Sequence, residues 1–229
     1  MRGNHYHHLI FGDHALARQR DTGSYAAYGA ATERPDDGPD AVGDREIAMF
    51  TAAFAFHMAT VSPAGWPYIQ YRTGPAGFVH HLGGNRFGFA DHHGNDQFAT
   101  IGNIESDAAA HPEITGGRVA LFLADHPRRI RVKMFGRATV IDAAADPALL
   151  DRLGILPHGG RIAARTERSI VIDVEAVDWN CSRSMIPLYD ADYVRALNVA
   201  HAEQSADLQA TIDRLTTELE TLRSPRATP

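Results

Sequence analysis

Short runs of apolar and β-branched residues, separated by turn-forming residues, fill the middle of the chain. Residues 56–61, 66–72, 78–82 and 86–90 form four such runs, and stretches rich in Gly, Pro, Ser and Asn lie between them. Runs of this length and composition, bounded by such residues, are typical of β-strands. Closely spaced strands with tight turns predict an antiparallel meander or barrel rather than alternating strands and helices.

Three later runs extend this sheet. Residues 118–124 are almost wholly apolar, which predicts a central and buried strand. Residues 130–140 alternate basic and apolar side chains, as in a strand with one solvated face, and Gly136 within them indicates a bulge or a close backbone approach, such as to a ligand. Residues 169–177 form the last core strand. The pattern therefore predicts six or seven strands in one sheet system, which fits a small closed barrel.

Helical periodicity is found mainly outside this strand-rich region. Ile47, Phe50 and Phe54 recur at helical spacing after Asp44, so we expect a helix over residues 45–54 with Asp44 as its N-cap. Further short helices are expected over residues 15–20, 25–28 and 147–153, and another is expected to begin at residue 96 with Asn95 as its cap. Residues 106–117 are polar and indicate an inserted loop.

The pattern changes to a spacing of three and four from residue 191 onward. The apolar and histidine positions are Val194, His201, Leu208, Ile212, Leu215, Leu219 and Leu222. This spacing predicts a long amphipathic helix with a heptad seam over its second half. Two interpretations stay open: a helix packed on its own domain, and a two-stranded contact in a dimer. The chain thus divides into an N-terminal helical and loop extension (1–44), a barrel domain (45–190) and a C-terminal helix and tail (191–229).

Composition narrows the class of protein. The 229 residues carry a net charge of −6, whereas a nucleic-acid-binding protein would present a basic face. The single cysteine, Cys181, excludes an internal disulfide and fits a reducing compartment. No apolar run approaches the ~18 residues of a membrane span, and the first residues lack the apolar core of a signal peptide. We therefore expect a cytoplasmic protein without nucleic-acid or membrane partners.

Seven of the 13 histidines occur in three groups: His5, His7 and His8; His80 and His81; and His92 and His93. Adjacent side chains on a strand point to opposite faces, so neighbouring histidines make poor chelating pairs, and no Cys or Glu lies at ligand spacing from them. The first group lies next to an apolar segment, so we interpret it as a segment that passes from the surface to the core rather than as a metal-binding tract. We expect no metal site.

Polar residues on the strands are better candidates for a binding site. Gln70 and Arg72 share one strand face, with Tyr71 opposite. Further polar groups are Asp91, Asn95 and Gln97 at the end of the neighbouring segment, and Arg131 and Lys133 on one face of a later strand. Guanidinium groups bind phosphate oxygens with two parallel hydrogen bonds, and a helix start adds backbone N–H donors for an anion. The set suits a phosphorylated, planar ligand that forms hydrogen bonds.

Several motifs follow one another in a recognisable order. They are WPYIQYR at residues 66–72, GP-x-GF at 74–78, GFAD at 88–91, GN-x-Q at 94–97, RVALFL at 118–123, GRA at 136–138 and DWNC at 178–181. Together they resemble the FMN-binding split-barrel family related to pyridoxamine 5′-phosphate oxidase, over about residues 45–190. The resemblance implies an α+β fold around a six-stranded antiparallel split β-barrel. It also implies a homodimer that holds two FMN molecules between its subunits.

The resemblance assigns cofactor roles to eleven residues. Arg72 is the best phosphate partner, beside Gln70 and Tyr71 along the flavin. The backbone of Ala90 and Asp91 would lie by the isoalloxazine ring. The remaining positions are Asn95 and Gln97 in the phosphate-side loop, Arg131 reaching the ring from the other subunit, Lys133 near the pyrimidine end, and Trp179 and Arg183 in the segment that closes the site.

The resemblance implies an FMN-dependent oxidoreductase acting on a small organic substrate, with Tyr71, His92 and His93 as candidate acid–base groups. Two features depart from the family pattern. Asp96 stands where relatives carry a basic residue, and residues 106–117 are longer than expected and suggest a lid or substrate loop. Two alternatives stay open: a deazaflavin-dependent enzyme or flavin reductase of the same fold, and a non-catalytic flavin- or tetrapyrrole-binding protein.

Overall fold

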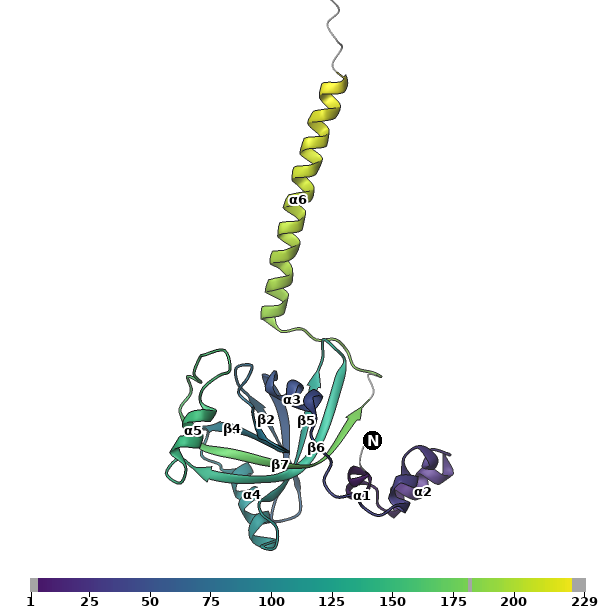
Figure 1. Cartoon of the computed structure of the whole chain (residues 1–229), viewed down its shortest axis with the longest axis vertical. Helices are drawn as coiled ribbons and strands as arrows, with labels where there is room; N and C mark the ends of the chain where they lie inside the picture. Colours follow the sequence, from purple (N-terminus) through teal and green to yellow (C-terminus); the bar gives the residue numbers. More distant parts are fainter. Residues whose placement is uncertain (1–3, 181–182, 224–229) are drawn as a thin grey trace, which may run out of the picture. The chain divides into compact units, whose positions relative to one another are not determined.

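The computed structural model describes residues 4–180 and 183–223 (Figure 1). Its contacts define two compact units. One contains the residues up to Asp125 together with Ile130–Ser184, and the other contains His126–Arg129 and the chain from Met185 onward. The domain boundaries that the sequence suggests, after residues 44 and 190, stay predictions. Cys181 lies outside the described residues.

The first unit is built on one antiparallel sheet of seven strands in the order β2-β1-β5-β6-β7-β4-β3. The strands are β1 (Ala55–Val61), β2 (Pro67–Thr73), β3 (His80–Gly83), β4 (Arg86–His92), β5 (Gly117–Asp125), β6 (Ile130–Asp142) and β7 (Thr166–Asn180). The antiparallel sheet of six or seven strands that the pattern predicts is confirmed, whereas the six-stranded barrel that the resemblance implies is one strand short. The seventh strand is the short β3, which pairs with β4 alone across a tight turn where Gly83 and Gly84 have positive φ angles.

The strands of the sheet curl around a common interior (Figure 1). Arg72 of β2 and Asp91 of β4 form an ion pair, although four strands separate β2 from β4 in the sheet order. In the described residues, strand pairing joins β4 to β7 and β3 but not to β2. The sheet is therefore a barrel closed along one seam by side chains rather than by backbone hydrogen bonds.

Aromatic side chains fill the interior of the curled sheet. Phe56 packs against Phe50, Phe78 and Phe89 with ring centroids 5.6–6.0 Å apart, and these four phenylalanines are at most 2% exposed. Burial of each such ring contributes roughly 1.5–3 kcal/mol. Strand β5 supplies Val119, Leu121 and Leu123 at alternate positions. The strand is central, as predicted, although only alternate side chains are fully buried.

Helices and 3₁₀ turns precede, interrupt and follow the sheet. They are α1 (His5–Ile10), α2 (Asp13–Asp21), η1 (Tyr25–Ala27), η2 (Gly29–Glu33), α3 (Asp44–Thr51), α4 (Ala99–Ala110), α5 (Pro147–Leu153) and α6 (Ala191–Arg223). The N-cap of α3 is Gly43 rather than Asp44, and its backbone N–H donates to Glu46 Oε2 at 3.0 Å. Helix α3 ends at Thr51, so Phe54 lies beyond it and is 54% exposed.

The two predictions around α4 are wrong. The helix begins at Ala99 rather than at residue 96, because Asp96 and Phe98 adopt left-handed backbone angles (φ 57° and 51°) that interrupt it. The expected loop over residues 106–117 is helical as far as Ala110, since three consecutive alanines favour helix and Pro112 follows shortly after its end. Only residues 111–116 are left as a connection, too few for the expected lid.

Helix α4 approaches β5 closely. A Cβ atom on Gly117 would lie 2.2 Å from the backbone oxygen of Ile104, so only glycine allows this contact. Farther along β6, the register shifts between Phe135 and Gly136, which confirms the predicted bulge. A Cβ on Gly136 would lie 2.5 Å from the backbone oxygen of Asp173, so the close approach is to β7.

Asp107 joins α4 to β5 by accepting the backbone N–H of Arg118 at 2.7 Å and bonding its guanidinium. These hydrogen bonds hold the pKa of Asp107 down at about 2, below its ordinary 3.8. A carboxyl pKa lowered by folding stabilises the protein above the unfolded value, and this contribution disappears as the pH falls from about 4 to 2.

We expect Asp107→Asn to cost about 1–2 kcal/mol at neutral pH, a value reduced for solvent screening, because the side chain of Arg118 is 56% exposed. The cost should vanish near pH 2. Urea denaturation of both proteins from pH 7 to pH 2 measures it, and a difference that does not change with pH would contradict the ion pair.

No helix among the described residues is long and apolar enough to cross a membrane. Helix α6, in the second unit, runs without interruption for 33 residues and contains no buried residue.

Candidate functional site

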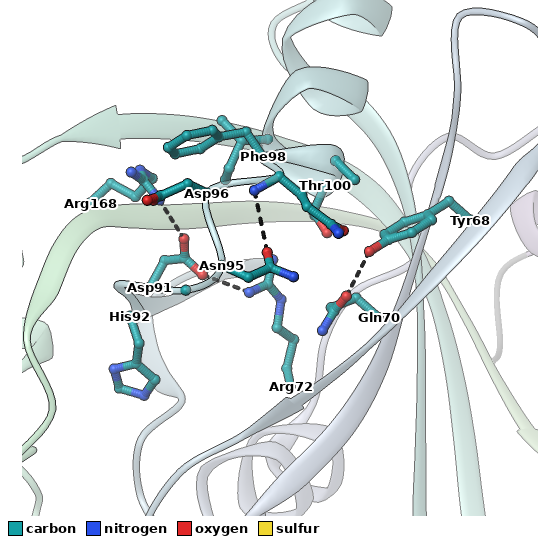
Figure 2. A pocket seen from close by; sticks show the side chains of 14 residues that line it. Tyr68, Gln70, Arg72, Asp91, His92, Asn95, Asp96, Phe98, Thr100 and Arg168 are labelled. Carbon is teal, nitrogen blue, oxygen red and sulfur yellow. Dashed lines mark hydrogen bonds and ion pairs between the residues drawn. The ribbon is translucent and has the colours of Figure 1, made fainter.

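A pocket of about 370 Å³ opens where the ends of β2 and β4 meet the segment that leads into α4 (Figure 2). Small-molecule sites commonly have volumes of about 300–1,000 Å³, so this pocket lies within that range. Its walls carry mostly polar groups. They come from β2 (Tyr68, Gln70, Arg72), β4 (Asp91, His92), the connecting segment (Gly94 to Phe98), the first turn of α4 (Ala99, Thr100, Ile101) and the start of β7 (Arg168).

Two arginines converge on one carboxylate at the floor of this pocket. Arg72 Nη1 donates to Asp91 Oδ1 at 2.6 Å, and Arg168 Nη1 donates to Asp91 Oδ2 at 3.0 Å (Figure 2). The side chains are only 17%, 6% and 12% exposed for Arg72, Asp91 and Arg168. Arg168 Nη2 also donates to Glu167 Oε2 at 2.9 Å. A guanidinium has five N–H donors, so each arginine still keeps donors for a ligand. Arg72 Nε is buried and has no hydrogen-bond partner among the described residues.

Neutral donors surround the two arginines. The Tyr68 hydroxyl donates to Gln70 Oε1 at 2.7 Å, which assigns the amide nitrogen of Gln70 as the donor that remains (Figure 2). Asn95 Oδ1 accepts the backbone N–H of Gln97 at 3.3 Å and so shapes the connecting segment. The first N–H groups of a helix have no partner within it, and those of α4 belong to residues that line the pocket. This arrangement is suited to an anion.

A smaller pocket of about 190 Å³ lies next to the first. It shares Arg72, Asp91, His92 and Gly94 with the larger pocket. The remaining walls are mainly aromatic and apolar and come from Tyr71, Thr73, Phe78, Phe89, Ala90 and His93. A polar pocket with two arginines therefore adjoins an apolar one, as a ligand with a charged group and a flat ring system would require.

His93 at the edge of the smaller pocket is oriented by a carboxylate. Its Nδ1 lies 2.7 Å from Glu167 Oε1 and 4.0 Å from Asp96 Oδ1, and its side chain is 45% exposed. The hydrogen bond from His93, with the nearby charges of Arg168 and Arg165, lowers the pKa of Glu167. Glu167 therefore stays ionised and fixes the orientation of the His93 imidazole. The other ring nitrogen, Nε2, is then the atom that can form a hydrogen bond with a ligand.

The structure brings together most of the sequence-predicted site residues. Gln70, Arg72, Asp91, Asn95 and Gln97 line the larger pocket, and Tyr71, Ala90, His92 and His93 line the smaller one. Asp96, which departs from the family pattern as an acid in place of a basic residue, also lines the larger pocket, with its side chain 64% exposed.

Four predicted residues line neither pocket. Arg131 and Lys133 lie near the start of β6, opposite the end of β7, and Lys133 Nζ is 3.7 Å from Asp178. The indole of Trp179 donates to Glu46 and stacks under the Arg45 guanidinium, 3.5 Å from the ring centroid. Arg183 is exposed. Their assignment to a flavin bound between subunits stays a prediction.

Arg168 is the principal site residue that sequence reasoning missed. It lies at the start of β7 and pairs directly with Asp91 in the β4–β7 register. Opposite charges on facing strand positions indicate a cross-strand pair, but only when the register is known. Tyr68 was missed as well, although it shares the strand face of Gln70 and Arg72.

No group of three or more His, Cys, Asp or Glu side chains is placed to hold a metal ion in the part of the chain that the structure describes. His5 bonds instead to Asp36, with Nδ1 2.8 Å from Oδ1.

Comparison with known proteins gives structural neighbours only. No family model and no curated protein matches the chain. A conserved hypothetical protein from Mycobacterium tuberculosis matches with 16% identity and a TM-score of 0.45, over 66% of this chain and 92% of its own. A candidate pyridoxamine 5′-phosphate oxidase from Lactobacillus delbrueckii matches with 17% identity and a TM-score of 0.43, over 60% and 93%. The protein HupZ of Group A Streptococcus matches with 16% identity and a TM-score of 0.41, over 61% and 99%.

The neighbours thus include proteins of the pyridoxamine 5′-phosphate oxidase type, which is the resemblance that the sequence motifs predicted. All the quoted TM-scores are below 0.5, so these neighbours assign no function or cofactor to this chain.

Proposed function

We propose that the protein is an FMN-dependent oxidoreductase that acts on a small organic substrate, with the flavin held at the interface of a homodimer. The observation that carries this proposal is the convergence of Arg72 and Arg168 beside the first turn of α4, next to a pocket with aromatic walls. This arrangement provides adjoining sites for a phosphate and for a planar ring system.

The phosphate side fits a phosphate monoester in its hydrogen-bond donors. Both guanidiniums are already paired with carboxylates, since they share Asp91 and Arg168 Nη2 also donates to Glu167 Oε2 at 2.9 Å. The remaining guanidinium N–H groups, the Gln70 amide and the first N–H groups of α4 are hydrogen-bond donors. Charge-assisted hydrogen bonds to phosphate are about twice as strong as neutral ones, so the arginines would dominate affinity at this end.

The smaller pocket would accept the ring. FMN, when bound, supplies the hydride or electron transfer, and the protein binds it, orients it and shapes the cavity over one face. Phe78 and Phe89, which are 1% and 2% exposed, would exclude water. His93, held through Nδ1 by Glu167, would give or take a proton at Nε2.

A second copy would complete the site. Trp66, Ile69 and Tyr71 on or next to β2 are 75%, 64% and 51% exposed, an apolar surface of the kind that marks protein interfaces. Arg131, Lys133, Trp179 and Arg183 line neither pocket of their own chain, and the dimer that we propose would present them to the flavin of the partner.

The proposal is tested by titrating ligand-free protein with FMN and with riboflavin, which differ only in the phosphate. We expect flavin fluorescence to change on binding and FMN to bind at least about 100-fold more tightly, equivalent to about 2.7 kcal/mol. Equal affinity for the two would contradict the phosphate site. Absence of binding by both would contradict the proposal as a whole.

One observation favours a second candidate. Asp96 lines the phosphate pocket, and a carboxylate there disfavours a phosphate dianion, so a deazaflavin with a different tail is the alternative cofactor. Binding of a deazaflavin cofactor in preference to FMN, measured in the same titration, would support it. Tight binding of either cofactor without turnover would instead indicate a carrier or storage protein.

A further inference from the structure

Helix α6 exposes an apolar stripe along its second half. The helix is continuous from Ala191 to Arg223, and none of its residues is buried. Five large apolar side chains of its second half are 46–82% exposed: Leu208, Ile212, Leu215, Leu219 and Leu222. They recur at spacings of four and three, so they lie on one stripe of the helix. An exposed apolar stripe of this kind marks a surface that binds a partner.

The spacing fixes a heptad register. With Ile212 and Leu219 at the a positions, Leu208, Leu215 and Leu222 occupy the d positions. The same register extends back through Ser205, His201 and Asn198 to Val194, so the seam covers about four heptads. Ile212 at one a position and Asn198 at another, combined with leucine at three d positions, favour two strands over three or four.

Polar residues on the seam and beside it indicate the orientation of the two strands. Asn198 occupies an a position, where an asparagine pairs with its own copy in a parallel dimer. In an antiparallel pair of the same extent, Asn198 would face leucines near the far end of the other helix, which would leave a buried amide unsatisfied.

The flanking charges agree with the parallel arrangement. Glu218 at a g position and Arg223 at the following e position would form ion pairs between parallel helices. The two g–e pairs that precede it along the helices are Gln204 with Gln209 and Thr211 with Thr216. Neither pair carries a charge, so neither opposes the parallel arrangement. Within one helix, Glu218 accepts a hydrogen bond from Arg214 at 2.9 Å. A partner's Arg223 would approach the same carboxylate from the other side of the seam.

From this register we infer that α6 binds a second copy of this chain as a parallel, in-register, two-stranded coiled coil. The occupant of the seam is the α6 of the partner, and the apolar second half supplies most of the contact. The polar first half sets register and orientation at a cost in stability. The inference does not depend on flavin binding, because none of the seam residues lines either pocket.

Disulfide cross-linking of the full chain tests the register directly. Cys181 is the only native cysteine, so the experiment uses a Cys181→Ser background with one new cysteine at a time. The d-position variants are Leu215→Cys and Leu222→Cys, and the matched control is Thr217→Cys, which lies at the outward f position. Facing d positions bring cysteines within the ~4.4–6.8 Å Cα separation of a disulfide, whereas f positions do not.

We expect mild oxidation to convert most of both d-position variants into covalent dimers and to leave Thr217→Cys largely monomeric on a non-reducing gel. Glu218→Lys should reduce the cross-linking of Leu215→Cys, and adding Arg223→Glu should restore it, since the charge pair is then exchanged rather than broken. If Glu218→Lys acted only by breaking the contact with Arg214 within one helix, adding Arg223→Glu would not restore the cross-linking.

Equal cross-linking of d and f variants would overturn the inference, because random collision would then explain it. Failure of both d variants would also overturn it, and would indicate an antiparallel or unpartnered helix. Flavin binding is measured on the same samples by the FMN titration. A protein that cross-links but binds no flavin contradicts the proposed function alone, and one that binds flavin without cross-linking contradicts only the coiled coil.

Discussion

Replacing Arg168 by alanine is expected to weaken FMN binding by about 10- to 150-fold while riboflavin binding changes little. The range corresponds to the loss of a hydrogen bond to a charged group, about 1.5–3 kcal/mol, at tenfold per 1.4 kcal/mol. Arg168 is 12% exposed and lies beside the pocket that we assign to the phosphate. The ratio of the two dissociation constants, measured by fluorescence titration, isolates the phosphate contribution from contacts with the ring.

Arg165→Ala is the matched control for this experiment. Arg165 is three residues away, is 78% exposed and lies 3.7 Å from Glu167, but it does not line the pocket. Its loss should leave the FMN-to-riboflavin ratio within about threefold of that of the native protein, as for a surface substitution. An equal effect of the two variants would indicate a general change of surface charge and would contradict a specific role of Arg168. If Arg72→Ala lowers the preference for FMN and Arg168→Ala does not, Arg72 binds the phosphate as the sequence predicts and Arg168 does not contribute.

The strands and their order of occurrence could be predicted from the sequence because alternation and turn residues are local signals. Residues 56–61, for example, alternate in burial as the pattern predicts. The start of α4 could not be predicted in the same way. Asn95 has the chemistry of an N-cap, but the left-handed angles at Asp96 and Phe98 follow from how the segment crosses the pocket. That path depends on the folded barrel, which no local signal encodes.

The candidate site was predictable only in part for the same reason. Gln70 and Arg72 share a strand face, which spacing alone predicts, and the structure places both in the larger pocket. Arg168 lies 77 residues from Asp91 in sequence. It reaches Asp91 only through the register of β4 against β7, so its role required the paired strands. The motif resemblance named Asp91 as a neighbour of the ring through its backbone, whereas its carboxylate also holds the two arginines together.

Asp91→Ala is expected to destabilise the ligand-free protein by about 3–5 kcal/mol, the usual cost of removing one partner from a buried ion pair. The carboxylate is 6% exposed and is shared by two guanidiniums that are themselves mostly buried. Without it, two like charges face one another across a small volume. Urea denaturation at pH 7 measures the change in the free energy of unfolding. Asp91→Asn should cost less, because the amide oxygen still accepts one hydrogen bond.

An anion should partly replace the missing carboxylate. Inorganic phosphate is therefore expected to raise the midpoint of unfolding more in Asp91→Ala than in the native protein, since it binds the folded state where the two guanidiniums lack the carboxylate that they share. Asp142→Asn is the control: Asp142 is 76% exposed and 3.8 Å from Arg168, so its effect should stay within about 0.5 kcal/mol. If Asp91→Ala is as stable as this control, the carboxylate does not bridge the arginines. If phosphate stabilises both proteins equally, the two guanidiniums do not form the anion site on which the proposed function depends.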